Sequence, residues 1–486
     1  MSKVAIITPS SPAFADIDRQ AAGGMGLWKP RDRGTVGHSE FAQYDLTLLS
    51  VAGVLLDRGY EVAFIDGQGL RLDTDALADR VRSFQPDTIV GMVQFVSLGS
   101  DLDILSVVKE RSACSCLVAV GSVNRILKEN VAGHAAVDFV IEGEPELATA
   151  DLLDALAEGG GDPDIPGVGW FRDGEMLGAA PGGRVALAEL PPLPYHLLAP
   201  YPYIDEFYFK PDKLGLVISS RGCPYQCRYY CPYPLAYGRK VVFRSPEVVV
   251  DEVEYLHREF GVRSFHFRDQ VFTLSEDHAR EVCHRLRDRE LDIRWLCETR
   301  VDLIHSDAML ADMMAAGCVQ IDFGLESGDP ELFAAVGKPG IDLARAEETV
   351  VRVRGKGLGA HVHVIVGLPG ETWETLRNTA NFLQRLGLSH INPNRCIPYP
   401  GTDLREEALA QGRVQTDDWT QYGNAFVMRT EDLSTRQLEL AFQYLVRNIY
   451  GGVLGRRGRI TTAFLNMLVE KVIWRGRGSV RHPCDA

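Results

Sequence analysis

Two series of apolar runs alternate with amphipathic stretches, and this alternation constrains the fold of the 486-residue chain more than any other feature. In the first series, "KVAIIT" (3–8), "YEVAFID" (60–66) and "DTIVGMVQF" (87–95) are typical of buried strands. Further strands are expected at 116–123 and 137–143, and helices at 45–59, 75–85, 102–111 and 145–159. Strands and helices that alternate at this spacing predict a parallel, doubly wound sheet. We therefore expect a Rossmann-like domain over residues 1–165.

The second series is longer and begins after a hairpin and a proline-rich linker, which we place at residues 166–210. Its six expected strands lie at 213–220, 264–269, 293–300, 318–326, 360–367 and 391–399, with helical stretches between them. Six βα units predict a partial barrel over residues 211–405, whose functional groups should lie at the carboxyl ends of its strands. Residues 406–486 are expected to be helical, and the glycine-rich segment 9–44 fits no periodic element.

Composition narrows the class of partner. The 51 Lys and Arg against 66 Asp and Glu give a net charge of −15, which disfavours nucleic acids and anionic membranes and favours a cationic ligand. No apolar run approaches the roughly 18 residues that span a bilayer, and "MSKVAIITPS" lacks the apolar core of a signal peptide. We expect a cytoplasmic protein, in which ten scattered cysteines do not form a disulfide framework.

Three cysteines stand close together in "RGCPYQCRYYCPYP", at positions 223, 227 and 231. A structural zinc site usually needs a fourth ligand, and a redox dithiol needs only two cysteines. Three thiolates on one loop can instead hold a four-iron cluster that leaves one iron open to a chelating ligand. The spacing favours the cluster and leaves zinc or a chance grouping as alternatives.

The motifs that follow this trio resemble those of the radical S-adenosylmethionine (radical SAM) superfamily, in the subgroup with an N-terminal cobalamin-binding-type domain. The matching segments are "FRDQVFT" (267–273), "WLCETRVD" (295–302), "GLESG" (324–328) followed by Lys338, "VGLPGET" (366–372) and "YPGTDL" (399–404). The resemblance implies that Cys223, Cys227 and Cys231 ligate a [4Fe-4S] cluster. It also implies that SAM chelates the open iron and is cleaved to a 5′-deoxyadenosyl radical.

The last gap of the cysteine motif holds three residues where the family usually has two, so we expect a local bulge before Cys231. This spacing is similar to that of the radical SAM diol dehydratases of aminoglycoside antibiotic pathways. The similarity implies removal of the 3′-hydroxyl of an aminoglycoside such as paromamine, after hydrogen abstraction at carbon 4′, to give a 4′-keto-3′-deoxy product. It further implies an external electron donor and a separate NADPH-dependent reductase. A cobalamin-dependent radical SAM methyltransferase is the alternative.

The first domain gives mixed signals for cobalamin. The chain has no D-x-H motif, and "GSVNRILKE" (121–129) lies where relatives often carry a Gly-Gly-Pro loop. We interpret this as disfavouring cobalamin, with functional binding left open. Asp138, Glu142 and Glu144 are interpreted as helix-entry and packing residues.

Candidate site residues follow from strand alternation and from the family motifs. For SAM we expect Glu298, Arg300, Glu326, Ser327, Gly367, Pro369 and Gly370. For the substrate we expect Asp302, Gln320 and Asp322, because carboxylates on barrel strands are costly to bury without a partner or ligand. His361, His363 and Asp269 are the expected catalytic residues.

Each of these assignments has a structural alternative. Asp269 would then cap a helix, the carboxylates would pair with Arg300, and the two histidines would be satisfied inside the barrel. Four other cysteines are expected to be core thiols, namely Cys283, Cys297, Cys318 and Cys396.

Overall fold

The computed structural model describes residues 2–10, 17–19, 27–28, 41–159, 162–173, 175–178, 180–198, 203–205, 213–225, 227–335, 341–388 and 391–450. The chain divides into two compact units. The first comprises 1–298, 311–319 and 400–402, and the second comprises 299–310, 320–399 and 403–486. Each unit is described by itself.

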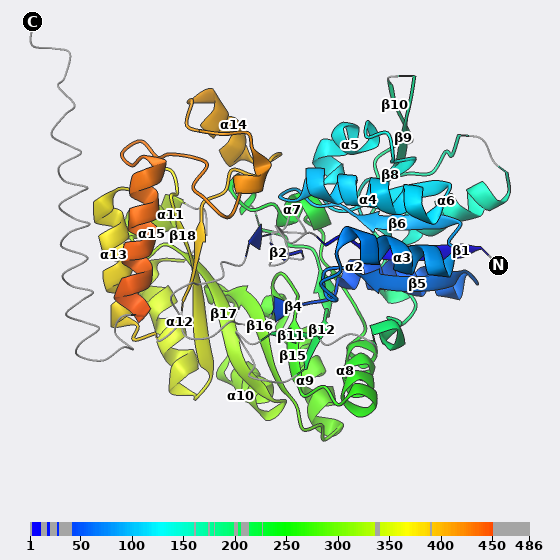
Figure 1. Ribbon diagram of the computed structural model, residues 1–486. Helices are drawn as coiled ribbons and strands as arrows, with labels where there is room; N and C mark the ends of the chain where they lie inside the picture. Colours follow the sequence, from blue (N-terminus) through cyan, green and yellow to red (C-terminus); the bar gives the residue numbers. More distant parts are fainter. Residues whose placement is uncertain are drawn as a thin grey trace, which may run out of the picture. The chain divides into compact units, whose positions relative to one another are not determined.

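The first unit begins with a seven-stranded sheet in the order β10-β9-β8-β7-β6-β1-β5 (Figure 1). Five strands are parallel: β1 (Lys3–Thr8), β5 (Glu61–Asp66), β6 (Thr88–Met92), β7 (Cys116–Val120) and β8 (Phe139–Ile141). The expected hairpin, β9 (Val168–Arg172) and β10 (Glu175–Gly178), adds two antiparallel strands beside β8. The parallel strands have the flavodoxin-like order 2-1-3-4-5, in which ligands bind at the carboxyl edge.

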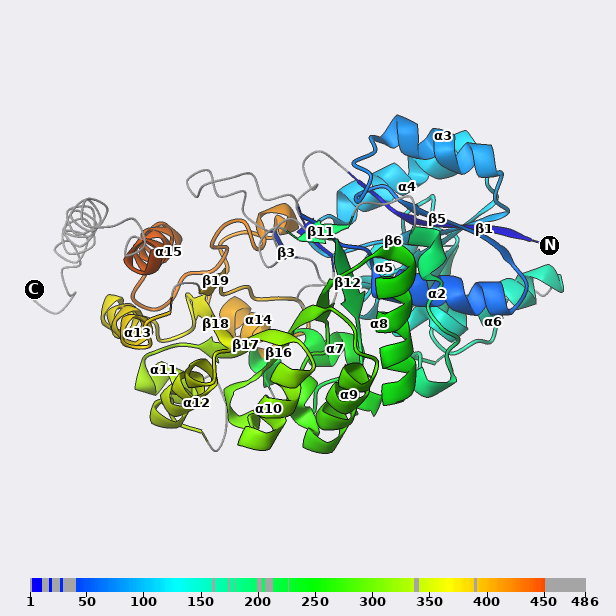
Figure 2. The same ribbon diagram turned by 90° about the horizontal axis from the view of Figure 1, so that it is seen from below.

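Helices cover both faces of this sheet, as the expected doubly wound fold requires (Figure 2). On one face α2 (Leu46–Asp57) packs beside α6 (Pro145–Ala157), and on the other α3 (Thr74–Phe84) packs beside α4 (Leu98–Ser112). The short helix α5 (Asn124–Ala132) follows β7. Helices α2 and α3 begin at aspartates, Asp45 and Asp73, whose side chains accept hydrogen bonds from the first-turn backbone N–H groups. These caps fix where each helix starts.

The second sheet has the order β12-β15-β16-β17-β18-β19, and its described pairs β12–β15, β15–β16, β17–β18 and β18–β19 are parallel. Its strands are β12 (Leu214–Val217), β15 (Ser264–Phe267), β16 (Arg294–Arg300), β17 (Cys318–Glu326), β18 (Gly359–Val366) and β19 (Asn392–Arg395). The associated helices are α8 (Pro246–Phe260), α9 (Glu276–Asp288), α10 (Asp307–Ala315), α11 (Pro330–Ala335), α12 (Leu343–Gly355) and α13 (Trp373–Arg385). This parallel βα series confirms the expected half-barrel.

Burial follows the predicted periodicity. In β18 the valines are buried and alternate with half-buried His361, His363 and Ile365, so one face carries the core and the other carries polar groups. The four cysteines expected in the core are buried, as predicted. No helix in the described ranges is long and apolar enough to cross a membrane.

The structure differs most from the sequence-based prediction in segments that show no periodicity. The described parts of 9–44 contain short strands: β2 (Ile17–Asp18) pairs with β3 (Leu27–Trp28), and β4 (Phe41–Ala42) pairs with β11 (Ile204–Asp205). Helices α14 (Asp403–Ala410) and α15 (Thr435–Tyr450) fall in the expected C-terminal helical region, of which residues 451–486 lie outside the described residues. The four predicted domain boundaries stay predictions.

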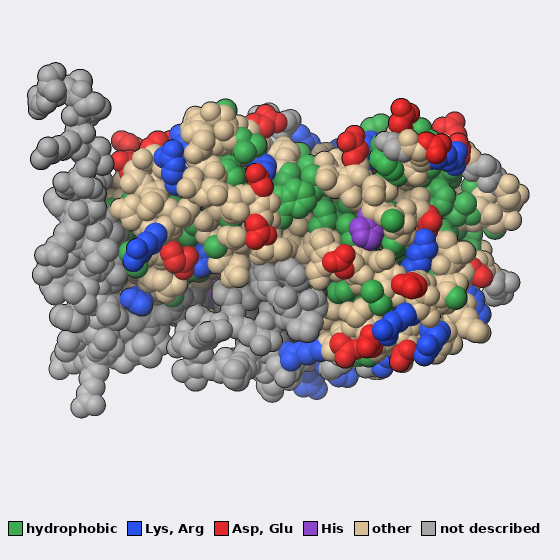
Figure 3. All heavy atoms as spheres, turned by 45° about the horizontal axis from the view of Figure 1, so that its top comes forward, with side chains coloured by type: hydrophobic (Ala, Val, Ile, Leu, Met, Phe, Trp, Pro, Cys, Tyr) green, Lys and Arg blue, Asp and Glu red, His purple; other side chains and the backbone are tan. Residues whose placement is uncertain are grey.

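Acidic and basic side chains are interspersed on the face that Figure 3 presents, rather than gathered into one patch of a single sign. Among the ion pairs of the described residues, Arg289 lies within 2.7 Å of Glu247, Asp251 and Glu254. Exposed pairs of this kind each contribute only about 0 to 1 kcal/mol to stability.

Candidate functional site: a cysteine loop, an adjoining cleft and a polar strand face

The cysteine trio lies on a loop that follows the short strand β13 (Ser220–Arg221). Cys227 begins a 3-10 turn, η4 (Cys227–Tyr229), and its carbonyl oxygen accepts hydrogen bonds from the N–H groups of Tyr230 (3.1 Å) and Cys231 (2.8 Å). The extra residue is therefore absorbed by a helical turn, and the expected bulge before Cys231 is wrong. All three cysteines are half-buried.

The residues fit an iron–sulfur cluster. Within the described ranges no three His, Cys, Asp or Glu side chains converge on a single ion. This finding does not test the cluster, because in a cluster each thiolate binds a different iron. Three thiols on one loop, with a helical turn between two of them, provide the donor set that three irons require. We therefore retain the three cysteines as the expected ligands.

Asp269 fixes the backbone that leads into this loop. Its carboxylate accepts hydrogen bonds from Ser219 N (3.0 Å), Ser219 Oγ (2.7 Å) and Ser220 Oγ (2.6 Å). Burial raises the pKa of Asp269, and the hydrogen bonds from the two serines oppose that rise. These contacts are not those of a helix cap, and the catalytic role expected for Asp269 stays a prediction. They make Asp269 a positioning residue for the loop.

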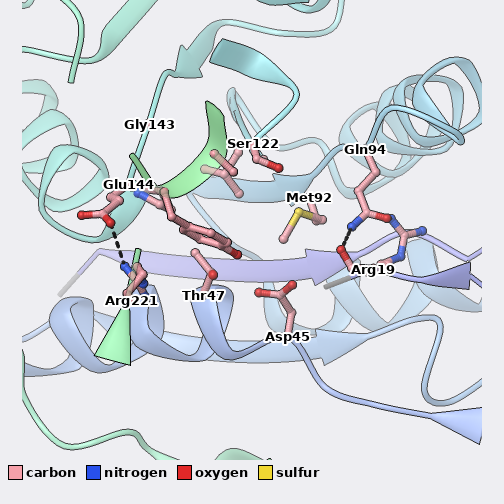
Figure 4. Close-up of a pocket in the computed structure, with 14 residues that line it drawn as sticks. Arg19, Asp45, Thr47, Met92, Gln94, Ser122, Gly143, Glu144 and Arg221 are labelled. Atoms are coloured by element: carbon pink, nitrogen blue, oxygen red, sulfur yellow. Dashed lines mark hydrogen bonds and ion pairs between the residues drawn. The ribbon is translucent and has the colours of Figure 1, made fainter. Parts of the chain in front are cut away.

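A cleft adjoins the loop inside the first unit, at the carboxyl ends of β6, β7 and β8 (Figure 4). Its cavity volume is about 40 Å³, and the space around it, open solvent at its mouth included, is about 510 Å³. Its lining residues are Arg19, Asp45, Thr47, Met92, Gln94, Val120, Gly121, Ser122, Gly143, Glu144, Pro145, Arg221, Ala236 and Tyr237. The last two belong to α7 (Tyr233–Tyr237), which comes directly after the cysteine loop, so a ligand in this cleft would lie between the first sheet and the loop.

Arg19 forms one wall of the cleft. Its guanidinium contacts both carboxylate oxygens of Asp101, at 3.1 and 3.2 Å, and Gln94 Oε1 at 3.4 Å. Figure 4 draws a further contact, in which Gln94 Nε2 donates to the Arg19 carbonyl oxygen. Nearby, burial raises the pKa of Asp45 to about 6, against the lowering effect of hydrogen bonds from the Leu48 and Thr47 backbone. The wall thus combines a paired cation with a carboxyl group that is easily protonated.

The turn after β7 keeps the feature that a close ligand approach needs. Gly121 has φ +151°, and a Cβ there would lie 2.1 Å from the Val93 carbonyl oxygen, so only glycine fits. Ser122 Oγ is buried without a hydrogen-bond partner among the described residues. The loss of a Gly-Gly-Pro sequence therefore does not remove the turn, and it was a weaker signal against cobalamin than we expected.

The lining fits a cobalamin in its chemistry. Met92, Val120 and Ala236 are apolar, while Thr47 and the unsatisfied Ser122 hydroxyl can bond the amide groups at a corrin's edge. No histidine or cysteine is among the residues that line the described cleft.

Arg221 forms the opposite wall, and sequence reasoning missed it. Its guanidinium lies 2.8 Å from Glu146 and 3.6 Å from Glu144, and Figure 4 shows the pair with Glu144. Burial alone would lower the pKa of Arg221, but Glu146 and Glu144 raise it. Glu144, which we interpret from the sequence as a helix-entry residue, does occupy the N-cap position of α6. Its carboxylate does not bond the helix backbone there and belongs to this buried ion-pair cluster.

A second group of predicted residues meets on β17 and β18, within the second unit. Asp322 Oδ1 accepts a 2.7 Å hydrogen bond from Gln320 Nε2, which also lies 3.2 Å from His361 Nδ1. The imidazoles of His361 and His363 lie 3.8 and 3.9 Å from the two Asp322 oxygens. Two residues expected to bind the substrate, Gln320 and Asp322, and two expected to be catalytic, His361 and His363, thus lie together on β17 and β18. Asn392 on β19, which we did not anticipate, contacts His363 Nδ1 at 3.2 Å.

The motif residues expected to bind SAM lie at the ends of β17 and β18. Glu326 adopts φ +68°, a conformation that non-glycine residues rarely take and that often marks a functional site. Ser327 Oγ lies 3.2 Å from Thr379 Oγ1. The Gly367 N–H donates to the buried carboxyl of Glu371, and burial raises the pKa of Glu371 to about 8. Pro369 and Gly370 complete this turn.

Three further candidates are held by local pairs. Arg300 and Asp302 bond each other at 2.9 and 3.0 Å, which is the structural alternative stated for them. Glu298 lies 3.5 Å from both Arg268 and His266. Lys338, part of the fourth motif, lies outside the described residues. The roles assigned to these residues stay predictions.

The fold and these features agree with known proteins. Residues 217–383 match the sequence model of the radical SAM superfamily. It is 28% identical over 382 residues to an uncharacterized methyltransferase of Pyrococcus horikoshii, covering 78% of this chain and 82% of the relative. It is 25% identical to the cytidylyl-2-hydroxyethylphosphonate methyltransferase of Streptomyces wedmorensis, covering 77% and 79%.

Among solved structures, the fold is similar to that of the radical SAM methyltransferase TsrM from Kitasatospora setae, solved with cobalamin and a [4Fe-4S] cluster. The TM-score is 0.66 at 20% identity, covering 86% of this chain and 76% of that one. The predicted architecture, a doubly wound domain followed by a radical SAM half-barrel, is confirmed. A [4Fe-4S] cluster and SAM follow from the radical SAM domain.

These relatives correct our functional expectation. Both curated relatives and the solved structure are named methyltransferases, so the expected dehydratase is wrong, and the alternative is better supported. The reductase was expected only for the keto product of that dehydration. Cobalamin, which we had disfavoured, is bound in the similar structure. The misleading signal was the cysteine spacing, which a helical turn accommodates without implying any particular reaction.

Proposed function

We propose that this chain is a radical SAM methyltransferase that uses cobalamin. One observation carries the proposal: the cleft at the carboxyl edge of the first sheet adjoins the loop that bears the three cysteines, and both lie in one compact unit. A cofactor held in that cleft would face the cluster. The names of the curated relatives support methyl transfer as the reaction.

The chain's own residues would divide the work between its parts. When bound, the cluster supplies electrons, SAM supplies the methyl group and cobalamin carries it. Cys223, Cys227 and Cys231 would hold the cluster, and Asp269 would keep their loop in place through Ser219 and Ser220. Thr47 and Ser122 would bond the edge of the corrin.

We assign the methyl acceptor to the polar face of β17 and β18. Asp322 is buried, and its Oδ2 has no hydrogen-bond partner in the described part of the chain. A buried carboxylate oxygen left in this state favours a ligand that donates a hydrogen bond. Gln320 holds the other oxygen, and His361 and His363 flank the group, so Asp322 would orient an acceptor that bears an N–H or O–H.

The test is an anaerobic reaction of the full chain, with its cluster reconstituted, with SAM that carries a trideuterated methyl group. A mixture of microbial small molecules serves as the acceptor pool, with and without added cobalamin. The proposal expects a product heavier by one trideuteromethyl group, formed only when cobalamin is present. A product that has lost water and gained no label would contradict it.

A further inference from the structure

The cluster of buried charges around Arg221 has no role in the reaction outlined above. The Arg221 side chain is 4% exposed, and those of Glu144 and Glu146 are 2% and 0% exposed. Burying three ionised groups is costly unless each is held by opposite charge, and such clusters contribute little net stability. Arg221 stands directly before "GCPYQC", so the presence of a buried charge cluster at this position needs an explanation other than stability.

Both carboxylates come from the start of α6 in the first α/β domain. Glu144 is the N-cap residue and Glu146 lies in the first turn, where the helix dipole favours negative charge. A second arginine completes the cluster: Arg184 Nη1 lies 2.8 Å from Glu144, and its Nη2 donates to the Arg221 carbonyl oxygen at 3.0 Å. Arg221 is thus fixed at both its side chain and its backbone.

The backbone that follows Arg221 is also held in place, as far as the first cysteine of the motif. The Gly222 N–H donates to Gln270 Oε1 at 2.9 Å, and the Cys223 N–H donates to the Gly238 carbonyl oxygen at 3.4 Å. At Gly222, φ is +109° and a Cβ would lie 2.4 Å from the Lys240 carbonyl oxygen. The backbone around Cys223 therefore has little freedom to adapt if Arg221 moves.

We propose that the buried cluster of Arg221, Glu144, Glu146 and Arg184 is a strut through which the first domain positions Cys223 for the iron–sulfur cluster. Arg221 and Glu146 are positioning residues, since neither touches the irons. This role depends on the cysteines holding a cluster and does not depend on methyl transfer or on cobalamin.

The principal variant is Glu146→Gln, which removes the nearest countercharge of Arg221. The matched control is Asp101→Asn, which removes the charged partner of Arg19. The Arg19–Asp101 pair is also buried, at 7% and 2% exposure, and within the described residues it does not contact the cysteine loop. Both full-length variants are reconstituted under identical conditions without a methyl acceptor. The readouts are iron per chain, the rate of iron loss to a chelator, the midpoint potential, and the electron paramagnetic resonance spectrum of the reduced cluster with and without SAM.

We expect Glu146→Gln to lose iron about 10-fold faster than the wild type, which is the lower end of the effect of residues that orient metal ligands. Its spectrum and midpoint potential should shift, while Asp101→Asn matches the wild type in all four readouts. Arg221→Lys, which keeps the charge opposite Glu146, should fall between the two. Equal iron loss in Glu146→Gln and Asp101→Asn, or an unchanged spectrum in Glu146→Gln, would overturn the proposal.

Glu146→Gln leaves the Arg221 charge with a weaker partner and could unfold the domain. The double variant Arg221→Met with Glu146→Gln removes both charges and should fold, because replacing a whole buried pair costs little. It should show a far-ultraviolet circular dichroism spectrum like that of the wild type and the same rapid iron loss. A folded double variant that keeps its cluster normally would also overturn the proposal. A wild type that holds its cluster normally but transfers no methyl group would instead count against the proposed function and leave the strut unaffected.

Discussion

Glu371 should make the stability of the second unit fall as pH rises. Its carboxyl is 2% exposed, accepts a hydrogen bond from Gly367 N–H and has a pKa of about 8, against 4.5 in an unfolded chain. Burial is the main cause of the rise, the Gly367 and Leu368 backbone N–H groups oppose it, and the negative charge of Asp329 adds to it. Because the folded state keeps this proton to higher pH, the folded state binds more protons than the unfolded state between pH 4.5 and 8.

The sign of the effect follows directly. The stabilising contribution of protonated Glu371 is complete below pH 4.5 and is lost as pH rises toward 8. A shift from 4.5 to about 8 corresponds to a loss of stability on the order of 5 kcal/mol across that range, at about 1.4 kcal/mol per pKa unit. The variant Glu371→Gln keeps an oxygen to accept from Gly367 N–H and has no proton to lose.

The assay compares the thermal unfolding of the wild type and Glu371→Gln at pH 5.5, 7.0 and 8.5. The difference in Tm should change in favour of the variant as pH rises, by several degrees from the lowest pH to the highest. Glu374→Gln is the matched control, because Glu374 lies three residues further along, in the first turn of α13, and is exposed. A constant difference in Tm between Glu371→Gln and the wild type at all three pH values would refute the reasoning.

Three further substitutions test the cysteine loop and the polar strand face. Gly222→Ala places a Cβ 2.4 Å from the Lys240 carbonyl oxygen at φ +109°, so iron per chain after reconstitution should fall severalfold; normal iron content would contradict this. The Asn side chain in Asp269→Asn cannot accept all the hydrogen bonds that the native carboxylate receives from the serines. The iron content of this variant should therefore also fall, although the residues of the SAM motifs are unchanged. An iron content equal to that of the wild type would rule out the positioning role. Asp322→Asn should retain the cluster and bind SAM, but its rate of methyl transfer should fall by about 100-fold or more. A raised KM for the acceptor would show that Asp322 binds it, and a lowered kcat would show that Asp322 orients it. Full activity would exclude the assigned acceptor site.

Sequence patterns predicted the elements well where the periodicity was strong. Strand alternation placed Gln320 and Asp322 on one face and His361 and His363 on the neighbouring face, and the structure brings all four together. This succeeded because side chains in a strand point to alternate faces, and because parallel neighbours fix the register.

Long-range partners could not be predicted in the same way. Arg221 pairs with Glu146, 75 positions away in sequence, and no local pattern relates an arginine beside a cysteine motif to the start of an earlier helix. The glutamates at the start of α6 were visible and acidic, which is typical of a helix N-terminus and therefore suggested only a cap. The contacts of Asp269 with Ser219 and Ser220 could not be predicted for the same reason, since they exist only in the folded chain.

The reaction was the least predictable feature. The cysteine spacing suggested a dehydratase, whereas the structure shows that one extra residue is absorbed by the hydrogen bond from Cys231 N–H to the Cys227 carbonyl oxygen. A loop length that a turn can accommodate says little about which bond the enzyme breaks. The cleft beside the loop carries more functional information, and its residues come from seven separate parts of the chain.

The fate of SAM tests the central claim most directly. The reconstituted full chain is incubated anaerobically with SAM and a reductant, with and without cobalamin, and S-adenosylhomocysteine and 5′-deoxyadenosine are quantified by mass spectrometry. A methyltransferase that uses cobalamin should form S-adenosylhomocysteine, the product left when SAM gives up its methyl group, only when cobalamin is present. Formation of 5′-deoxyadenosine alone, at the same rate with or without cobalamin, would contradict the account.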